Sequence, residues 1–193
     1  MSLVPGKTRT KKPRRVNNKR ELLLDAAERV AVRHGAAHLT LDAVAKEARV
    51  GKGGLIYHFP SKKALFQAML ERAVGIYAMS VQAALAKPLN RGNFVQAHIQ
   101  SLASFGERHE QLSTIIISVA VHYPDLLRPL RRQAMQRYEK MLSQGKSGHL
   151  AFAAVMAVNG LFLMECLGVG PLRTKNRQRF INGLSALIEE QIQ

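Results

Sequence analysis

The segment TLDAVAKEARVGKGGLIYHFPSKKAL, residues 40–65, decides the fold of this chain. Its first part predicts a short helix with Thr40 as the N-cap, because the apolar residues that follow recur at helical spacing. These apolar residues are Leu41, Val44, Ala45 and Ala48. A tight turn at residues 49–51 leads into another helix of about two turns over residues 52–58, which is the third predicted helix of the chain. Pro60 closes that helix, since the residue before a proline avoids helical geometry.

The rest of the chain is also helical in its periodicity. A helix is predicted over residues 18–34 with Gly35 as its C-terminal cap, and another from Ser61, its N-cap, toward Ala86. Further helices are predicted at about residues 93–106, 110–122, 125–143, 147–168 and 174–192. The β-branched run from Ile115 to Val121 is ambiguous between helix and strand. The predicted fold is therefore all-α, with about nine helices.

Charge and periodicity divide the chain into three parts. Residues 1–17 read as a basic flexible arm, residues 18–65 as a helix-turn-helix head and residues 66–193 as a helical body. The 193-residue chain has a formal net charge of +16 and a pI near 10.7, and no acidic residue occurs among residues 1–20. Such a charge favours a polyanionic partner, although a basic terminal segment can also be a merely solubilising tail.

The helix-turn-helix carries residues that a purely structural helix avoids. Gly53 and Gly54 fall in the first turn of the third helix, where each costs roughly 1 kcal/mol relative to alanine. Lys62 and Lys63 begin the fourth helix, where the positive end of the macrodipole disfavours each by roughly 0.3 to 1 kcal/mol. Lysines that point into solvent would explain an isolated pair. A DNA backbone close to this surface explains both features, so we predict DNA binding.

Across residues 40–65, together with the first helix, this chain resembles the DNA-binding segment of TetR-family transcriptional regulators over about residues 18–75. The resemblance implies a set of candidate DNA-contacting positions. These are Thr40, Arg49, Lys52, Gly53, Gly54, Tyr57, His58, Lys62 and Lys63. Lys52 and Gly54 open the recognition helix and are the residues placed for base edges, whereas Tyr57, His58 and Lys62 are expected to serve phosphates. Val44, Leu55, Phe59 and Leu65 are expected in the core of the head.

Three positions depart from the family pattern. Arg49 replaces a glycine in the turn, so it must either adopt a positive φ or shift the turn. Gly51 replaces a serine or threonine as the cap of the third helix, which glycine can still fulfil. Gly54 replaces a small hydroxyl residue and so removes one possible contact to DNA.

Helix-turn-helix heads read DNA in pairs, so the body must supply a homodimer interface. The last two predicted helices offer apolar stripes for this purpose, and the resemblance implies a four-helix bundle between two subunits. The candidate interface residues are Leu161, Leu172, Phe180, Leu184, Leu187 and Ile188. Left uncovered, these stripes would form a patch that soluble monomers rarely expose.

The body also offers candidates for a small-molecule pocket on or near apolar helix faces. They are His98, Phe105, His122, Tyr123, Met156, Asn159, Phe162 and Glu165. Asn159 and Glu165 need polar partners if they are buried, and either a ligand or a neighbouring helix supplies these. A ligand would act by favouring a geometry in which the two heads no longer match the operator, with the helix from Ser61 to Ala86 as the lever.

Several function classes are disfavoured. The sequence has no metal-ligand spacing, phosphate-binding glycine loop or nucleophile motif, so no enzyme, cofactor, metal or catalytic residue is predicted. The single Cys166, the lack of a signal peptide and the absence of an apolar run near 20 residues indicate a cytoplasmic protein without a membrane partner. We expect a dimeric repressor of an inverted-repeat operator. The alternative is a ligand-independent basic protein that coats DNA.

Overall fold

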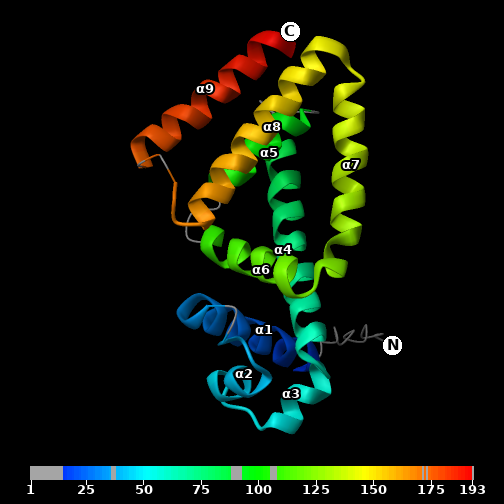
Figure 1. Cartoon of the computed structure of the whole chain (residues 1–193), viewed down its shortest axis with the longest axis vertical. Coiled ribbons are helices and arrows are strands. Elements are labelled where there is room, and N and C mark those ends of the chain that lie inside the picture. The colour runs from blue at the N-terminus through cyan, green and yellow to red at the C-terminus, as the bar shows by residue number, and fades with distance from the viewer. Residues whose placement is uncertain are drawn as a thin grey trace, which may run out of the picture.

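The computed structural model describes residues 15–35, 38–87, 93–104, 108–170, 172 and 174–192. The basic arm over residues 1–14 lies outside these ranges. Within them the chain is all-helical, as predicted, with nine α-helices and a short 3-10 helix (Figure 1). The α-helices are α1 (Arg15–His34), α2 (Leu41–Glu47), α3 (Lys52–His58), α4 (Lys62–Leu85), α5 (Phe94–Ser104), α6 (Arg108–His122), α7 (Arg128–Leu142), α8 (Gly145–Cys166) and α9 (Thr174–Ile192). The 3-10 helix is η3 (Pro124–Leu127).

The predicted boundaries agree closely with the observed ones. Helix α1 begins at Arg15, earlier than the predicted start at Asn18, and Gly35 follows it with a φ of 77°. Residues 115–121 lie inside α6, so the ambiguous run is helical. Both predicted side-chain caps are present: the Thr40 hydroxyl accepts a hydrogen bond from the Ala43 amide at 3.1 Å, and the Ser61 hydroxyl accepts one from the Ala64 amide at 3.1 Å. These caps satisfy amides that the first helical turn leaves unpaired.

Helices α1 to α3 and the first half of α4 pack into a head at one end of the molecule (Figure 1). Its core contains all four residues that the sequence assigned to it, Val44, Leu55, Phe59 and Leu65, each almost fully buried. Apolar area removed from water by such packing is the main stabilising contribution to a small head.

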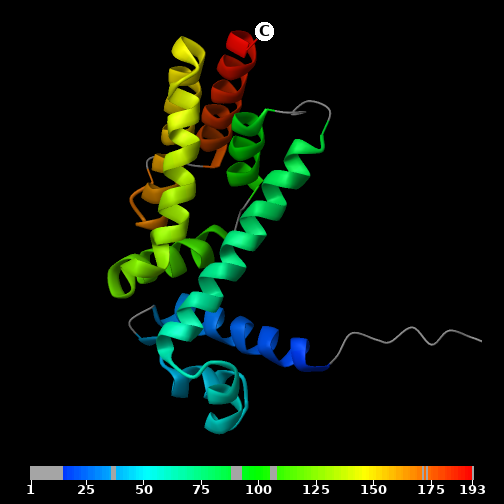
Figure 2. The same cartoon turned by 90° about the vertical axis from the view of Figure 1, so that its right-hand side faces the viewer.

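The body is built from the remainder of α4 together with α5, α7, α8 and α9. Buried aliphatic side chains of α5, α8 and α9 form its core. Helix α4 runs continuously from the head into the body (Figure 2). Helix α6 crosses between the two parts, and its Ile115 and Val119 are buried in the head core. The ring of Tyr123, after α6, lies 5.4 Å from that of Phe66 in α4. Head and body are therefore joined by a shared apolar core rather than by a loose linker.

Helix α8 is more apolar than was expected of any helix in this chain. Over Gly145–Glu165 it reaches a mean hydropathy of 1.6 and is, among the described residues, the one helix long and apolar enough to cross a membrane by length and composition. The expectation that no run approaches that length is therefore wrong for α8. Core helices of soluble proteins share these properties, and α8 packs against α5, α6, α7 and α9. Only 33% of this apolar segment of α8 is nevertheless buried within the chain.

Candidate nucleic-acid interface

The recognition helix α3 lies at the tip of the head (Figure 1), and Leu55 is its one buried residue. The Tyr57 side chain is 81% exposed, which is unusual for a large aromatic residue. Lys52 and Gly53 are also exposed at the start of the helix. A prominent aromatic side chain beside a lysine and bare backbone is a surface suited to contact with sugar and phosphate groups.

The other predicted DNA contacts surround α3 in the same head. Thr40, Arg49 and Lys63 are exposed, whereas Gly54, His58 and Lys62 are partly buried. Thr40 and Ser61 cap α2 and α4, so the amide-bearing N-termini of these helices are also at the surface. Helix N-termini bind phosphate through free amides and the positive end of the dipole.

The turn before α3 shows which of the two expected backbone conformations Arg49 adopts. Arg49 adopts a φ of 55°, so it accepts the left-handed conformation that glycine takes at this position in the family pattern. A non-glycine residue in this region costs roughly 1 to 2 kcal/mol. Gly51 caps α3 with extended backbone and contributes no side-chain hydrogen bond.

Acidic residues of the head are paired with its own bases. Lys52 Nζ lies 2.9 Å from Asp42 Oδ1, which joins α3 to α2. Glu47 is bound by Arg29 at 2.6 Å and by Arg33 at 3.3 Å. The hydrogen bond from Arg29, with the charges of both arginines, holds the pKa of the Glu47 carboxyl below its usual value against a smaller effect of burial. The remaining cations of the head are thus left to set its potential toward DNA.

Two bases near the start of α1 were missed as candidates for this surface. The Arg20 guanidinium lies over the Phe59 ring at 5.4 Å from its centroid. The ammonium of Lys19 lies 3.9 Å from the point where a Cβ on Gly54 would stand. Sequence periodicity places both residues on a helix, but only the packing of α1 across α3 brings them to the recognition helix.

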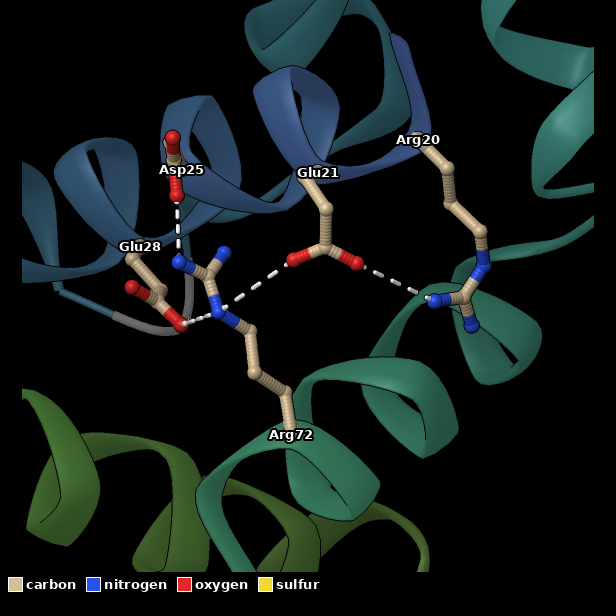
Figure 3. A network of polar contacts seen from close by, with 5 residues as sticks. All are labelled: Arg20, Glu21, Asp25, Glu28 and Arg72. Carbon is tan, nitrogen blue, oxygen red and sulfur yellow. Dashed lines mark hydrogen bonds and ion pairs between the residues drawn. The ribbon is translucent and has the colours of Figure 1, made fainter. Parts of the chain in front are cut away.

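A polar network anchors α1 to α4 just behind this surface (Figure 3). Arg72 of α4 donates a hydrogen bond to Asp25 and lies 3.7 Å from a carboxylate oxygen of Glu21 and of Glu28, all on α1. Burial lowers the pKa of Arg72, but the hydrogen bond to Asp25 and the nearby carboxylates outweigh this effect and raise it. The guanidinium is therefore charged at any working pH and holds the two helices together.

In the body, the pocket candidates His98 and Asn159 lie together. His98 of α5 is almost fully buried and bonds Tyr77 of α4 through Nδ1 at 2.6 Å and Asn159 of α8 through Nε2 at 3.1 Å. Because the Asn159 Oδ1 only accepts, Nε2 carries the proton and Nδ1 accepts from the Tyr77 hydroxyl. Burial lowers the pKa of His98 to about 4, with the bond to Asn159 acting in the opposite direction. His98 is neutral at pH 7.

An aromatic ring stacks on this polar chain, and the apolar core of the body lies next to it. The Phe94 ring stacks on His98 with centroids 5.8 Å apart, and Met156 and Phe162 pack against the same apolar core as Tyr77. Burial raises the pKa of Tyr77 to about 12.

The other pocket candidates lie apart from His98. His122 is exposed at the end of α6, where its Nδ1 bonds the Ser118 carbonyl at 3.1 Å, and Tyr123 packs against the head. Glu165 accepts a hydrogen bond from Arg177 of α9 at 2.7 Å, so a neighbouring helix supplies its partner. Phe105 lies outside the described residues.

Two surface grooves occur elsewhere in the described part of the chain. One, of about 770 Å³, lies between the ends of α1 and α2, and the other, of about 510 Å³, lies between α5 and α9. None of the described pocket candidates lines either groove.

The dimer candidates separate into two groups. Leu161 and Ile188 are buried in the core of their own body, and Leu172 and Leu184 are partly buried. Phe180 and Leu187 of α9 are 37% and 54% exposed. Apolar side chains of α8 that the sequence did not single out are also exposed: Leu163, Met164 and Leu167. We call these five exposed residues the α8–α9 apolar surface. These residues lie on or next to two helices that pack against one another, and exposed apolar side chains gathered on a surface are candidates for contact with a partner.

An exposed recognition helix in a three-helix head, carried on an all-helical body, defines a DNA-binding protein of the helix-turn-helix class. Residues 23–69 match the model described as bacterial regulatory proteins of the tetR family, and residues 92–189 match that of the tetracyclin repressor-like C-terminal domain. The chain belongs to the TetR family of DNA-binding transcriptional regulators, which are not enzymes.

Curated relatives and solved structures are similar to the chain over most of its length. The chain is 26% identical over 132 residues to the nucleoid occlusion factor SlmA of Vibrio cholerae, covering 68% of this chain and 67% of the relative. The crystal structure of the multidrug binding protein EbrR complexed with imidazole is 25% identical, covers 90% of this chain and 96% of its own, and has a TM-score of 0.58. A transcriptional regulator from Rhodococcus sp. RHA1 shares the fold at 19% identity, with a TM-score of 0.69 and coverage of 89% and 96%.

Proposed function

We propose that this chain is a cytoplasmic, homodimeric repressor that binds an inverted-repeat operator and is released by a small-molecule ligand. The observation that carries the proposal is the combination of two exposed surfaces on one rigid chain. The recognition helix α3 is exposed at one end of the molecule, and the α8–α9 apolar surface is exposed on the body. Burying the second surface against another copy would hold two recognition helices at the fixed spacing that an operator requires.

Steric occlusion by a dimer supports repression rather than activation. A dimer seated on a promoter blocks other proteins by steric occlusion, which needs no further surface. One head reads too few base pairs for useful specificity, and a pair of heads related by a two-fold axis reads an inverted repeat with half-sites roughly 34 to 36 Å apart or at multiples of that distance.

The ligand is proposed to enter the body near the cluster of Tyr77, His98 and Asn159. This cluster joins α4, α5 and α8, so a molecule that replaced its internal hydrogen bonds would alter how α4 packs against the body. EbrR, which shares 25% of its residues with this chain, has been solved with imidazole and with ethidium. The aromatic ring of Phe94, which stacks on His98, suits a flat aromatic molecule of the same kind.

Selection of bound sequences from a random duplex pool at near-physiological salt tests the DNA-binding part of the proposal. Wild-type protein is expected to enrich one inverted repeat, and the variants Lys52→Ala and Tyr57→Ala are expected to lose it. Both side chains are exposed, so neither substitution should unfold the head. Enrichment of single half-sites without symmetry would contradict binding of the operator by a dimer.

Titration of ethidium into the protein–operator complex tests the ligand. We expect release of DNA by wild-type protein and a weaker response from Asn159→Ala, measured with the operator labelled and the free dye's own binding to DNA subtracted. An operator affinity and head separation unchanged by bound dye would contradict the proposed release mechanism.

A second candidate function is a basic protein that coats DNA without a ligand. The net charge of +16 and the likeness to proteins named nucleoid occlusion factors favour it. Both functions lose affinity as salt rises, but only a repressor keeps its preference for one sequence against a large excess of competitor DNA. Competition binding therefore separates the two.

A further inference from the structure

Gly54 leaves a gap in the first turn of the recognition helix. A Cβ built on it would have a single neighbour within 4 Å beyond the local helix backbone, and that neighbour is the ammonium of Lys19 at 3.9 Å. A Cβ on Gly53, one residue earlier, would meet nothing. The cation of α1 thus stands beside the part of α3 where side chains normally reach the floor of the major groove.

The position of Lys19 is set by the framework of the head. Its neighbour Arg20 lies over the Phe59 ring and 3.7 Å from Glu21. Glu21 in turn is one of the three carboxylates of α1 that surround Arg72 of α4 (Figure 3). These contacts tie the start of α1 to the end of α3 and to α4, so Lys19 is presented from a fixed helix.

The lysines around α3 differ in their partners. Lys52 is paired with Asp42 at 2.9 Å, and Lys62 lies over the Phe66 ring at 5.7 Å from its centroid. Among the residues that the structure describes, Lys19 has no carboxylate within ion-pair distance, and its side chain is exposed. All three of its donors are available to an acceptor on DNA.

We propose that Lys19 is a specificity-determining residue that donates, through the gap left by Gly54, to the O6 and N7 acceptors of a guanine in the major groove. Lysine paired with these atoms is one of the ordinary direct contacts of DNA recognition. Here the contact comes from α1, outside the helix-turn-helix pair, because residue 54 has no side chain to make it. The inference rests on the proposed sequence-specific binding.

The test measures operator affinity for Lys19→Ala, for Lys19→Met, which keeps the length of the side chain, and for Lys87→Ala, a control that removes an exposed lysine at the far end of α4. Each protein is titrated with the selected site and with a set carrying single base-pair changes. Both Lys19 variants are expected to lose discrimination at one guanine in each half-site by roughly tenfold or more while keeping it elsewhere. The control is expected to keep the full pattern.

Substitution of the gap itself provides a second, independent measurement. Gly54→Ser is expected to change the preference at the same base pair, and its effect should disappear when Lys19→Ala is added, because the two act on one contact.

Three results would overturn the proposal. A uniform loss for all sites with a salt slope reduced by about one per head would assign Lys19 to a phosphate. An unchanged pattern would remove it from the interface. If wild-type protein itself showed no sequence preference, the result would contradict the proposed repressor function. The proposed recognition of guanine by Lys19, which depends on that function, would then be contradicted as well.

Discussion

Arg72 on α4 donates a hydrogen bond to Asp25 on α1 at 2.5 Å, linking two helices whose contacting residues lie 47 positions apart in the chain. Helix α4 carries the head at one end and enters the body at the other (Figure 2). The pair therefore fixes the angle between α1, which carries Lys19, and α4.

Replacing Arg72 by glutamine is expected to destabilise the protein and to weaken operator binding. The change removes the cation that Glu21, Asp25 and Glu28 share, which should lower the free energy of unfolding by roughly 1 to 3 kcal/mol. Urea denaturation measures this directly. The matched control is Arg128→Gln, which removes an exposed ion pair to Asp125 and should change little. Equal effects of the two substitutions would contradict the anchoring role.

His98 is expected to make the protein acid-sensitive. Its pKa is about 4 in the folded chain and about 6.5 when unfolded, so below pH 6.5 the unfolded state binds a proton that the folded state does not. Stability is therefore complete above pH 6.5 and falls as the pH drops toward 4, by roughly 2 kcal/mol at pH 5.

Unfolding of wild-type protein and of His98→Asn at pH 7 and pH 5 measures this contribution. The variant should lose less stability between the two pH values than the wild type. His149→Asn serves as the control because His149 is exposed and bonds only a carbonyl of its own helix. An identical pH dependence in His98→Asn and wild type would show that the acid sensitivity arises elsewhere.

Arg49 is expected to combine strain with a DNA contact. Arg49→Gly should raise stability by up to about 1 kcal/mol, since relief of the positive φ exceeds the added entropy of glycine in the unfolded chain. The same variant should bind operator more weakly because a cation is lost. Arg49→Asn separates the effects, as asparagine tolerates the conformation without charge. A stability gain with unchanged affinity would remove Arg49 from the DNA interface.

The α8–α9 apolar surface is expected to hold the dimer. Leu163→Glu places a charge on a side chain that is 51% exposed within one chain, so the subunit should still fold but remain monomeric. Sedimentation equilibrium gives the mass. Met135→Glu on α7, at 57% exposure, is the matched control and should stay dimeric. Retention of the dimer by Leu163→Glu would place the interface on another face.

Features that depend on neighbours along the chain can be predicted from the sequence. The order of helices, the caps at Thr40 and Ser61 and the turn before α3 follow from hydrogen bonds and backbone preferences that span four residues or fewer. The family resemblance over residues 40–65 added the class of partner. The membrane-like apolarity of α8 was underestimated because small residues and a few polar ones interrupt its run.

Which apolar helix face packs against which depends on how the whole helices are arranged in space. Leu161 and Leu163 are equally apolar and lie on opposite faces of α8, and the packing of the body buries Leu161 and leaves Leu163 exposed. The partner of Glu165 is Arg177, and Lys19 meets Gly54, through contacts that no local pattern encodes. The hydrophobic effect is non-directional, so a sequence specifies how much apolar surface must be covered. The packing of whole helices decides what covers it, and therefore which side chains are left for DNA, ligand and a second copy.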